Sequence, residues 1–440
     1  MRQLLLVSFW YPPTKMVGGV RPAALVKYLP RFGWECTVLT PSVEGTCRDA
    51  TMVLETEYRD ILQDWKARLG LDRKRTVREQ VGLSSAGRPG SLPASARVLN
   101  LVRYFLSYPD PRKGWIPFAL AAVEELHRQN RQIDAIVTTF PPVPVHVIGG
   151  EAKRILGCPW IADFRDLWTQ NLAARQTRFL QIGLEKRTLQ SADALVTVSA
   201  PWASRLQQRY PDKKVYTIPN GFDPDDFRAP PPPLTPEFSI TYTGQLYLDQ
   251  RDPTLLLQVV SDLVKRGAIP ADQVRVRFYG PIEPWLPALV EKYGLQQVVE
   301  LHGSVGRKEV FEHQRESQIL LILPWSAASE TGHHSAKLFE YFAAARPILA
   351  VGGNRGVLTE ALEETRAGVH ALSEPEVRAF LLRAFDDYKK DGRVPYSANQ
   401  QAIEQYSHPE MARSFARVLD SVVEAKESSL TSPVSVGDPS

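Results

Sequence analysis

The 440-residue chain has few cysteines, and their spacing suits neither a disulfide nor a metal site. Cys36, Cys47 and Cys158 form an odd, widely spaced set without a CxxC pair, which argues against a disulfide framework and a structural zinc site. Long apolar runs are also missing. The N-terminal LLLV is shorter than the apolar core of a signal peptide, and no run approaches the length of a membrane span. These absences predict a cytoplasmic protein, either free or peripheral at the inner face of the membrane.

A large net charge of one sign is absent as well. The net charge is +4, with 43% hydrophobic and 23% charged residues, which excludes a dedicated nucleic-acid binder and indicates a globular protein large enough for two domains. Residues 59–113, within an insertion at about 46–115, nevertheless hold 12 basic and 5 acidic residues. This basic insertion, which contains Arg73, Lys74, Arg75 and Arg78, suits contact with anionic lipid or a lipid-linked diphosphate. A solvated insertion is an equally good interpretation.

Apolar strands alternate with amphipathic helices in both halves of the chain, and this alternation predicts parallel sheets. We expect strands at 4–9, 34–40, 135–139, 159–162, 194–198, 215–218, 239–243, 274–279, 298–302, 319–323 and 347–351. The insertion interrupts the pattern without a clear strand. The proline run at 230–233 predicts an interdomain linker. The expected fold class is therefore α/β, with two doubly wound Rossmann-like domains facing across a cleft.

The expected domain boundaries follow from the linker. The N-terminal domain is predicted at 1–225 and the C-terminal domain at 226–404, with a helix at about 405–425 packing back on the first domain. Residues 427–440 are predicted to be disordered, because ESSLTSPVSVGDPS is polar and rich in serine and proline.

Two segments of the first half carry candidate site residues. Gly18 and Gly19 follow the first strand and can bring backbone N–H groups close to a ligand, although a plain tight turn is the alternative. Asp163, Arg165 and Asp166 directly follow an apolar strand, where ligand crevices form in such sheets; an internal Asp–Arg pair is the alternative.

His146 lies in an apolar helical segment and is a weaker candidate. A single histidine on such a face is more often a buried core residue than a functional one.

The segment SAKLFEYFAAARPILAV at 335–351 predicts a helix that begins after Ser335 and leads into a buried strand. Lys337 and Glu340 lie one turn apart on this helix. The helix start and the lysine favour a phosphate, and the carboxylate can accept hydrogen bonds from hydroxyl groups. The alternative is a surface ion pair.

Several stretches together resemble retaining glycosyltransferases of the GT-B fold, family 4 type. In chain order they are LLLVSFWYPPTKMVGGVRPAALVKYLPRFGWECTVLT, WIADFRDLWTQN, ADALVTVSAPWASRL, IPNGFDPDDF, ITYTGQLYLDQRDPTLLLQ, FYGPIE, LHGSVGRKEVFEHQRESQILLI and the 335–351 segment. The resemblance implies an acceptor-side N-terminal domain and a nucleotide-sugar-binding C-terminal domain.

The resemblance also implies roles for individual residues. Arg251 and Lys337 match the family's basic pair at the donor diphosphate, and Glu340 matches the ribose ligand. Asp166 matches a residue that faces the transferred sugar, while Arg165 stands where many relatives have histidine. The first of the family's two glutamates is missing, since its position holds Gly332. The remaining implied donor-site residues are Gly18, Gly19, Gly244, Gly280, Val305, His334 and Ser335, with Asp166, Arg251 and Lys337 as the catalytic set.

The predicted function is hexosyl transfer from a nucleotide-sugar donor to a saccharide or lipid-linked hydroxyl acceptor, with retention, in cell-surface polysaccharide or glycolipid synthesis. No DxD-like pair suited to holding a divalent ion on a diphosphate is evident, so we expect neither a metal nor another cofactor. A nucleotide-sugar 2-epimerase of the same fold and a catalytically silent scaffold remain alternatives.

Overall fold

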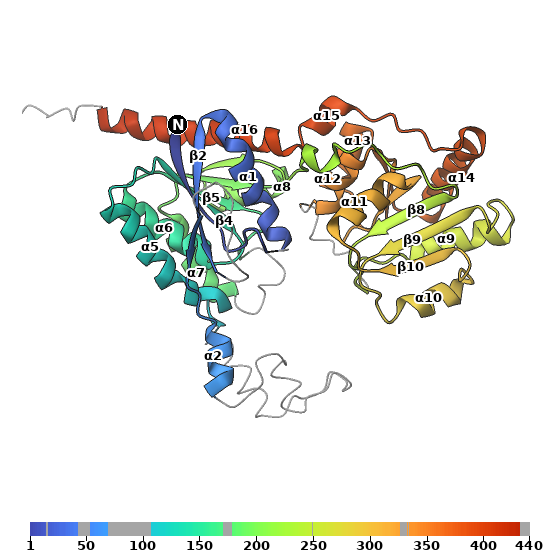
Figure 1. The fold of residues 1–440 in the computed structure, drawn as a ribbon, viewed down its shortest axis with the longest axis horizontal. Coiled ribbons are helices and arrows are strands. Elements are labelled where there is room, and N and C mark those ends of the chain that lie inside the picture. Colours follow the sequence, from blue (N-terminus) through green and yellow to red (C-terminus); the bar gives the residue numbers. More distant parts are fainter. Residues whose placement is uncertain are drawn as a thin grey trace, which may run out of the picture. The chain divides into compact units, whose positions relative to one another are not determined.

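The computed structural model describes residues 1–14, 16–42, 53–68, 107–169, 178–248, 250–325, 332 and 334–431. The chain forms two compact units. The N-terminal unit comprises Met1–Thr197, Ala203–Ile218 and Ala412–Ser440, and the C-terminal unit comprises Val198–Trp202 and Pro219–Met411. Each unit is built on its own parallel sheet with helices between the strands (Figure 1). The predicted α/β class of two doubly wound domains is confirmed.

The sheet of the N-terminal unit has the strand order β3-β2-β1-β4-β5-β6-β7, and every pairing is parallel. Its strands are β1 Arg2–Val7, β2 Trp34–Pro41, β3 Val53–Thr56, β4 Ala135–Phe140, β5 Trp160–Phe164, β6 Ala194–Thr197 and β7 Lys214–Thr217. Its α-helices are α1 Val20–Tyr28, α2 Ile61–Arg68, α5 Ile116–Arg128, α6 Pro144–Leu156, α7 Arg178–Leu189, α8 Ala200–Arg209, of which 200–202 fall in the C-terminal unit, and α16 His408–Thr431 from Ala412 onward. Short 3-10 helices occupy Val17–Gly19, Leu29–Phe32 and Pro111–Trp115. Because helices cover both faces, the central strands are buried and largely apolar, and β1 has no exposure from Leu4 to Val7.

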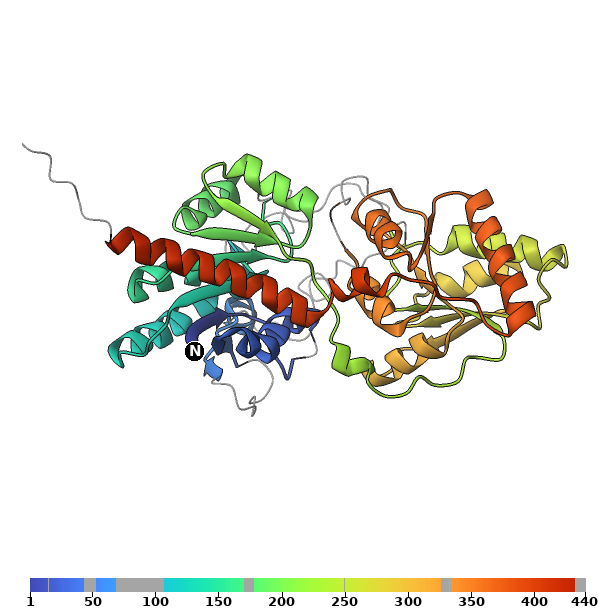
Figure 2. The same ribbon diagram turned by 90° about the horizontal axis from the view of Figure 1, so that it is seen from above.

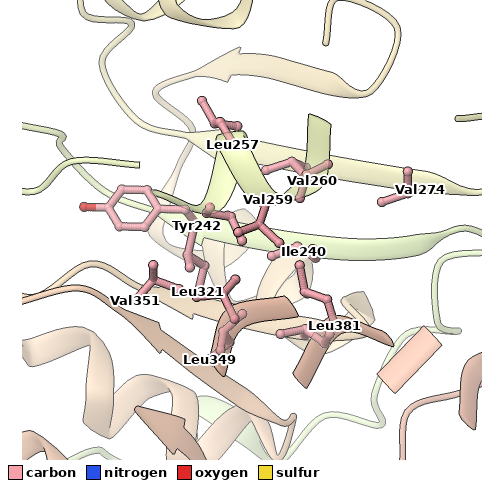
Figure 3. Packing of buried hydrophobic residues seen from close by; sticks show 14 of the residues in the cluster. Ile240, Tyr242, Leu257, Val259, Val260, Val274, Leu321, Leu349, Val351 and Leu381 are labelled. Carbon is pink, nitrogen blue, oxygen red and sulfur yellow. The ribbon is translucent and has the colours of Figure 1, made fainter. Parts of the chain in front are cut away.

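The sheet of the C-terminal unit has the order β10-β9-β8-β11-β12-β13, again with parallel pairings. Its strands are β8 Phe238–Thr243, β9 Val274–Tyr279, β10 Val299–Gly303, β11 Ile319–Ile322, β12 Ile348–Val351 and β13 Gly368–Ala371. Its helices are the 3-10 helix Pro224–Phe227, α9 Thr254–Lys265, α10 Leu286–Tyr293, α11 Arg307–Glu316, α12 Ala336–Ala344, α13 Val357–Thr365, α14 Glu374–Asp391 and α15 Gln400–Glu404. In the core on one face, side chains of α9 and α14 meet those of β8, β11 and β12, and Tyr242 extends its hydroxyl away from the other labelled side chains (Figure 3).

Helix α16 lies along the N-terminal unit (Figure 2). Asp420 Oδ1 accepts hydrogen bonds from Arg2 Nη1 at 2.9 Å and from the indole N–H of the fully buried Trp34 at 3.0 Å. The guanidinium of Arg21 lies 4.9 Å from the ring of Phe415. The helix continues to Thr431, so the prediction of disorder from Glu427 is wrong for 427–431. Residues 432–440 lie outside the described part of the chain.

Two further predictions of organisation are corrected. Residues 53–56 of the insertion form β3, which pairs with β2 at the edge of the sheet. The proline run belongs to the C-terminal unit, which begins at Pro219 rather than at 226 and ends at Met411 rather than at 404. The flanking backbone is fixed there, since Thr235 N–H donates to Glu316 O at 2.8 Å and Arg315 donates to Ala229 O at 2.5 Å. A proline run removes N–H donors but leaves carbonyl acceptors that a neighbouring arginine can bind.

None of the helices within the described ranges is long and apolar enough to cross a membrane. Most of the basic insertion, including Arg73, Lys74, Arg75 and Arg78, lies outside the described residues.

Candidate functional site

Each sheet has a point where the strand order reverses, and doubly wound sheets bind ligands at the carboxyl ends of the strands beside that point. In the C-terminal unit the reversal lies between β8 and β11. The turn after β8 carries Gly244 and Arg251, and the segment after β11 leads through Trp325 toward α12. In the N-terminal unit the reversal lies between β1 and β4, and the turn after β1 carries Gly18 and Gly19.

Gly244 and Gly280 occupy positions that other residues fit poorly. Their φ angles are +120° and +153°, which lie in the region that favours glycine. A Cβ on Gly244 would lie 2.5 Å from Cε and 2.7 Å from Nζ of Lys337, and a Cβ on Gly280 would lie 2.2 Å from Gly244 O. The glycines therefore let the ends of β8 and β9 approach each other and let the lysine lie against the backbone.

Lys337 lies in the first turn of α12 with its ammonium group 5.2 Å from the ring centre of Tyr242. Burial, and then the nearby positive charge of Arg251, lower the pKa of Lys337 to about 7, while Glu340 opposes this shift. Two positive groups so close together favour an anion between them.

Arg251 is held by two aromatic rings. Its guanidinium lies 5.0 Å from the ring centre of Trp325 and 5.7 Å from that of Tyr247, and the two rings stack with centres 5.5 Å apart. This cation–π arrangement restricts the side chain while leaving its N–H groups able to donate. Tyr247 and Trp325 were not predicted as site residues from the sequence. The signal that could have identified them is an aromatic residue after each of the two strands beside the reversal point.

Glu340 is 24% exposed. Its Oε2 accepts from Gln314 Nε2 at 3.3 Å, and its Oε1 lies 3.6 Å from Arg307 Nη1. Burial raises the pKa of Glu340, and Arg307, Gln314 and Lys337 act against that rise. No ion pair joins Lys337 to Glu340 among the described residues, so the surface ion pair considered from the sequence is not what this helix presents.

The other predicted donor-site residues differ in how they are placed. Ser335 occupies the N-cap position of α12, but its hydroxyl makes no capping hydrogen bond. His334 is 9% exposed, and its ring packs against Phe339 with centres 5.7 Å apart. Val305 is partly buried in the turn between β10 and α11.

In the N-terminal unit, Arg165 joins three turns at the carboxyl edge of the sheet. It follows β5, and it donates from Nη1 to Gly18 O at 2.8 Å and from Nη2 to Pro141 O, after β4, at 2.9 Å. A Cβ on Gly18 would lie 2.7 Å from the Trp10 ring, whereas one on Gly19 would make only ordinary contacts. The turn therefore requires glycine at position 18 and not at 19.

The acidic residues beside Arg165 have different surroundings. Asp163 is fully buried and forms an ion pair at 2.9 Å with Arg21 of α1, whereas the Asp–Arg pair considered from the sequence was one within this segment. Asp166 is partly buried, and its charge acts on Arg165. Of the two, Asp166 alone is accessible.

His146 is a core residue. It is fully buried, its Nδ1 lies 2.7 Å from Thr138 Oγ1, and its ring stacks on Phe140. Burial, and then the charge of Arg165, lower its pKa to about 3, so the imidazole is neutral at physiological pH.

Comparisons with known proteins agree with the geometry of both units. Residues 19–226 match the model of Glycosyltransferase Family 4. No curated protein matches the chain in sequence. Among solved structures, HepE of Anabaena in complex with UDP is similar at 13% identity and a TM-score of 0.60, over 96% of this chain and all of that one.

Two further structures give the same result. Sucrose-phosphate synthase from Thermosynechococcus elongatus is similar at 13% identity and a TM-score of 0.61, over 97% of this chain and all of that one. Trehalose 6-phosphate synthase from Burkholderia multivorans is similar at 11% identity and a TM-score of 0.61, over 99% of each chain. The predicted resemblance in fold is confirmed: this chain has the GT-B fold, and its residues 19–226 match the family 4 glycosyltransferase model.

Proposed function

We propose that the protein transfers a hexosyl group from a nucleoside-diphosphate donor to a hydroxyl of a saccharide or lipid-linked acceptor, with retention and without a metal. The observation that carries this proposal is the cluster of Gly244, Arg251 and Lys337 at the reversal point of the C-terminal sheet. Support also comes from HepE, which was crystallised with UDP, with UDP and glucose, and with UDP-glucose.

The diphosphate is the group that this cluster suits. As the bond between the sugar and the diphosphate breaks, its electron pair goes to the phosphate oxygen, and negative charge grows there. Lys337 and Arg251 are fixed close together before the donor arrives, so their charges stabilise the leaving group without further reorganisation. Two side-chain cations can supply the charge that a divalent metal supplies in other transferases.

Glu340 serves the nucleoside part of the donor in this proposal. Its carboxylate is partly exposed and is held by Gln314 and Arg307, so it can accept hydrogen bonds from ribose hydroxyls without a large rearrangement. Gly280 and the backbone near Val305 form the proposed base-binding edge, and Ser335 begins the helix that faces the phosphates.

On the N-terminal unit we assign Asp166 to polar contact with the transferred sugar and the turn at Gly18 and Gly19 to the acceptor side. Arg165 fixes this turn through Gly18 O. The substrate class fits cell-surface polysaccharide or glycolipid synthesis, with the basic insertion at 46–115 as the surface for an anionic membrane.

A donor screen tests the proposal. UDP-, GDP-, ADP- and dTDP-sugars are compared by thermal shift, and transfer to acceptors is then measured with the donor that stabilises the chain. Lys337→Ala should lower turnover by a factor corresponding to about 1–3 kcal/mol. Lys308→Ala is the control, since Lys308 is an exposed lysine on α11. EDTA should leave initial rates unchanged.

The same screen separates the alternatives. A sugar product formed without acceptor would favour the 2-epimerase. Absence of affinity for every nucleotide sugar would favour the silent scaffold, and a strict requirement for Mg²⁺ or Mn²⁺ would contradict the proposed role of the two cations.

A further inference from the structure

A hollow lies at the opposite edge of the C-terminal sheet from the Gly244–Lys337 cluster. It has a volume of about 320 Å³ and is formed where β12 and β13 begin, beside α14 and the segment 394–397. The candidate donor site lies at the carboxyl ends of these parallel strands, so the two sites are at opposite ends of the sheet. A hollow of this size is at the lower end of the range for small-molecule sites.

One wall of this amino-edge pocket is apolar. Phe380 of α14, Val369 of β13 and Val394, together with the prolines Pro347 and Pro395, line it. Phe380 and Val394 are 8% and 7% exposed, so the wall continues into the core that packs α14 against the sheet.

The polar lining is mostly positive. Arg366 and Arg383 line the pocket with a single acidic side chain, Asp387. Both arginines are exposed, and within the described part of the chain neither forms an ion pair.

A third arginine, Arg346, adds to the positive charge. Arg346 is partly buried and donates from Nε to Arg315 O at 3.0 Å. Burial, and then the charges of Arg315 and Arg393, lower the pKa of Arg346. Tyr396 also acts on Arg346, so this cationic group lies beside the pocket wall.

The hydroxyl of Tyr396 lacks a hydrogen-bond partner. It is buried, and among the described residues nothing accepts its proton or donates to it. Burial raises the pKa of Tyr396, so the group stays protonated. Its ring packs against the cluster that contains Leu320 and Phe339, on the other face of the sheet from Phe380. The polar groups open to a ligand in the pocket are therefore the two arginines, which suit a ligand that carries negative charge.

We propose that the amino-edge pocket binds a small phosphomonoester, with the phosphate at Arg366 and Arg383 and a ring-sized remainder against Phe380 and Val394. The phosphate oxygens accept hydrogen bonds from both guanidinium groups, neither of which has a carboxylate partner among the described residues. The pocket is separate from the candidate donor site, and this inference does not depend on the proposed transferase activity.

Phenyl phosphate is the probe, because it joins a phosphomonoester to an apolar ring, and inorganic phosphate is compared with it at matched ionic strength. Binding is measured by titration calorimetry and by the shift in melting temperature of the full chain. We expect phenyl phosphate to bind more tightly than inorganic phosphate, and Arg383→Gln to weaken it about tenfold or more, as for loss of a charged hydrogen bond.

Matched variants locate the site. Lys390→Gln removes one positive charge from the same helix, outside the pocket lining, and should leave the affinity unchanged. Arg366→Gln should weaken binding without loss of fold, and Lys337→Ala should bind phenyl phosphate as the wild type does. Absence of binding to the wild type at millimolar concentration, equal loss in Arg383→Gln and Lys390→Gln, or loss in Lys337→Ala would overturn the proposal.

Discussion

At the residue scale, the lowered pKa of Lys337 should make binding of the proposed donor depend on pH. Below pH about 7 the side chain is already charged, and above it a bound diphosphate must draw a proton onto the amine. The dissociation constant of UDP should therefore be nearly constant below pH 7 and rise by up to about tenfold per pH unit between 7 and 9. Calorimetry across this range measures the rise. Lys337→Arg should flatten the profile, and an unchanged slope in that variant would contradict the assignment.

Glycine at position 244 is required for two separable reasons. Gly244→Ala should lower the free energy of unfolding by about 1–3 kcal/mol, because it combines a positive φ with a clash against Lys337. Gly267→Ala is the matched control, since Gly267 has a φ of +68° with nothing within 4 Å of a Cβ. Chemical denaturation of both variants separates strain from clash. Equal losses of unfolding free energy in the two variants would show that the clash of the new Cβ with Lys337 has no energetic cost.

Arg165 is a positioning residue in the N-terminal unit. Arg165→Ala removes two charged hydrogen bonds to the carbonyls of Gly18 and Pro141, and we expect a loss of about 1.5–3 kcal/mol in unfolding free energy. Arg154→Ala, at a residue whose side chain is 72% exposed, should lose less than about 0.5 kcal/mol.

The kinetic effect distinguishes this role from mere support of the fold. Arg165→Lys, which keeps the charge but loses the fork, should raise the KM for acceptor more than it lowers kcat. A change confined to kcat would place Arg165 at the chemistry instead.

The two site residues that were not predicted from the sequence, Tyr247 and Trp325, escaped prediction for the same physical reason. Lys337 and Glu340 were found because they lie one turn apart on a helix with a clear period. Tyr247 and Trp325, which contact Arg251, follow two different strands and are about 80 positions apart along the chain. Their rings meet only because β8 and β11 are neighbours in the sheet. Local sequence patterns do not indicate which turns lie next to each other at the edge of a sheet.

At the element scale, buried strands were the most predictable part of the fold. Runs such as Ile319–Ile322 are apolar throughout because both faces of a parallel sheet are covered. The edge strands β3 and β13 were missed, since neither is buried throughout: β3 is only partly buried along its length, and the first half of β13 is partly exposed. Their strand character comes from pairing with β2 and β12 rather than from their own sequence.

Helix α16 contributes a polar anchor to the N-terminal unit. Asp420→Ala should lower the unfolding free energy by about 1–3 kcal/mol, because it leaves the buried Trp34 indole N–H without its acceptor. Denaturation followed by tryptophan fluorescence measures this change. Glu424→Ala, at an exposed acid on the same helix, should change stability by less than about 0.5 kcal/mol, and a loss as large as that of Asp420→Ala would indicate a general effect of helix charge.

At the scale of the whole molecule, positive charge is unevenly distributed along the chain. The net charge is +4, while residues 59–113 alone carry 12 basic and 5 acidic residues. Binding to anionic liposomes should therefore fall steeply with added salt, since screening acts beyond about 10 Å at 0.1 M.

Neutralising Arg73, Lys74, Arg75 and Arg78 together should abolish liposome binding and leave hydrolysis of the donor intact. Neutral liposomes are the control lipid surface. Liposome binding by the quadruple variant equal to that of the wild type would make the segment a solvated insertion and favour a soluble acceptor.

The path of the chain through the two units sets an order of events during translation. Apart from the short piece 198–202, the C-terminal unit is one continuous stretch, 219–411, whereas the N-terminal unit is completed only by residues from 412 onward. The ribosome therefore delivers every strand of the C-terminal sheet before it delivers Asp420. The indole N–H of Trp34 therefore lacks its acceptor, Asp420, until the second half of the chain has been synthesised. The N-terminal unit, whose strands are made first, is completed by the helix that is made last.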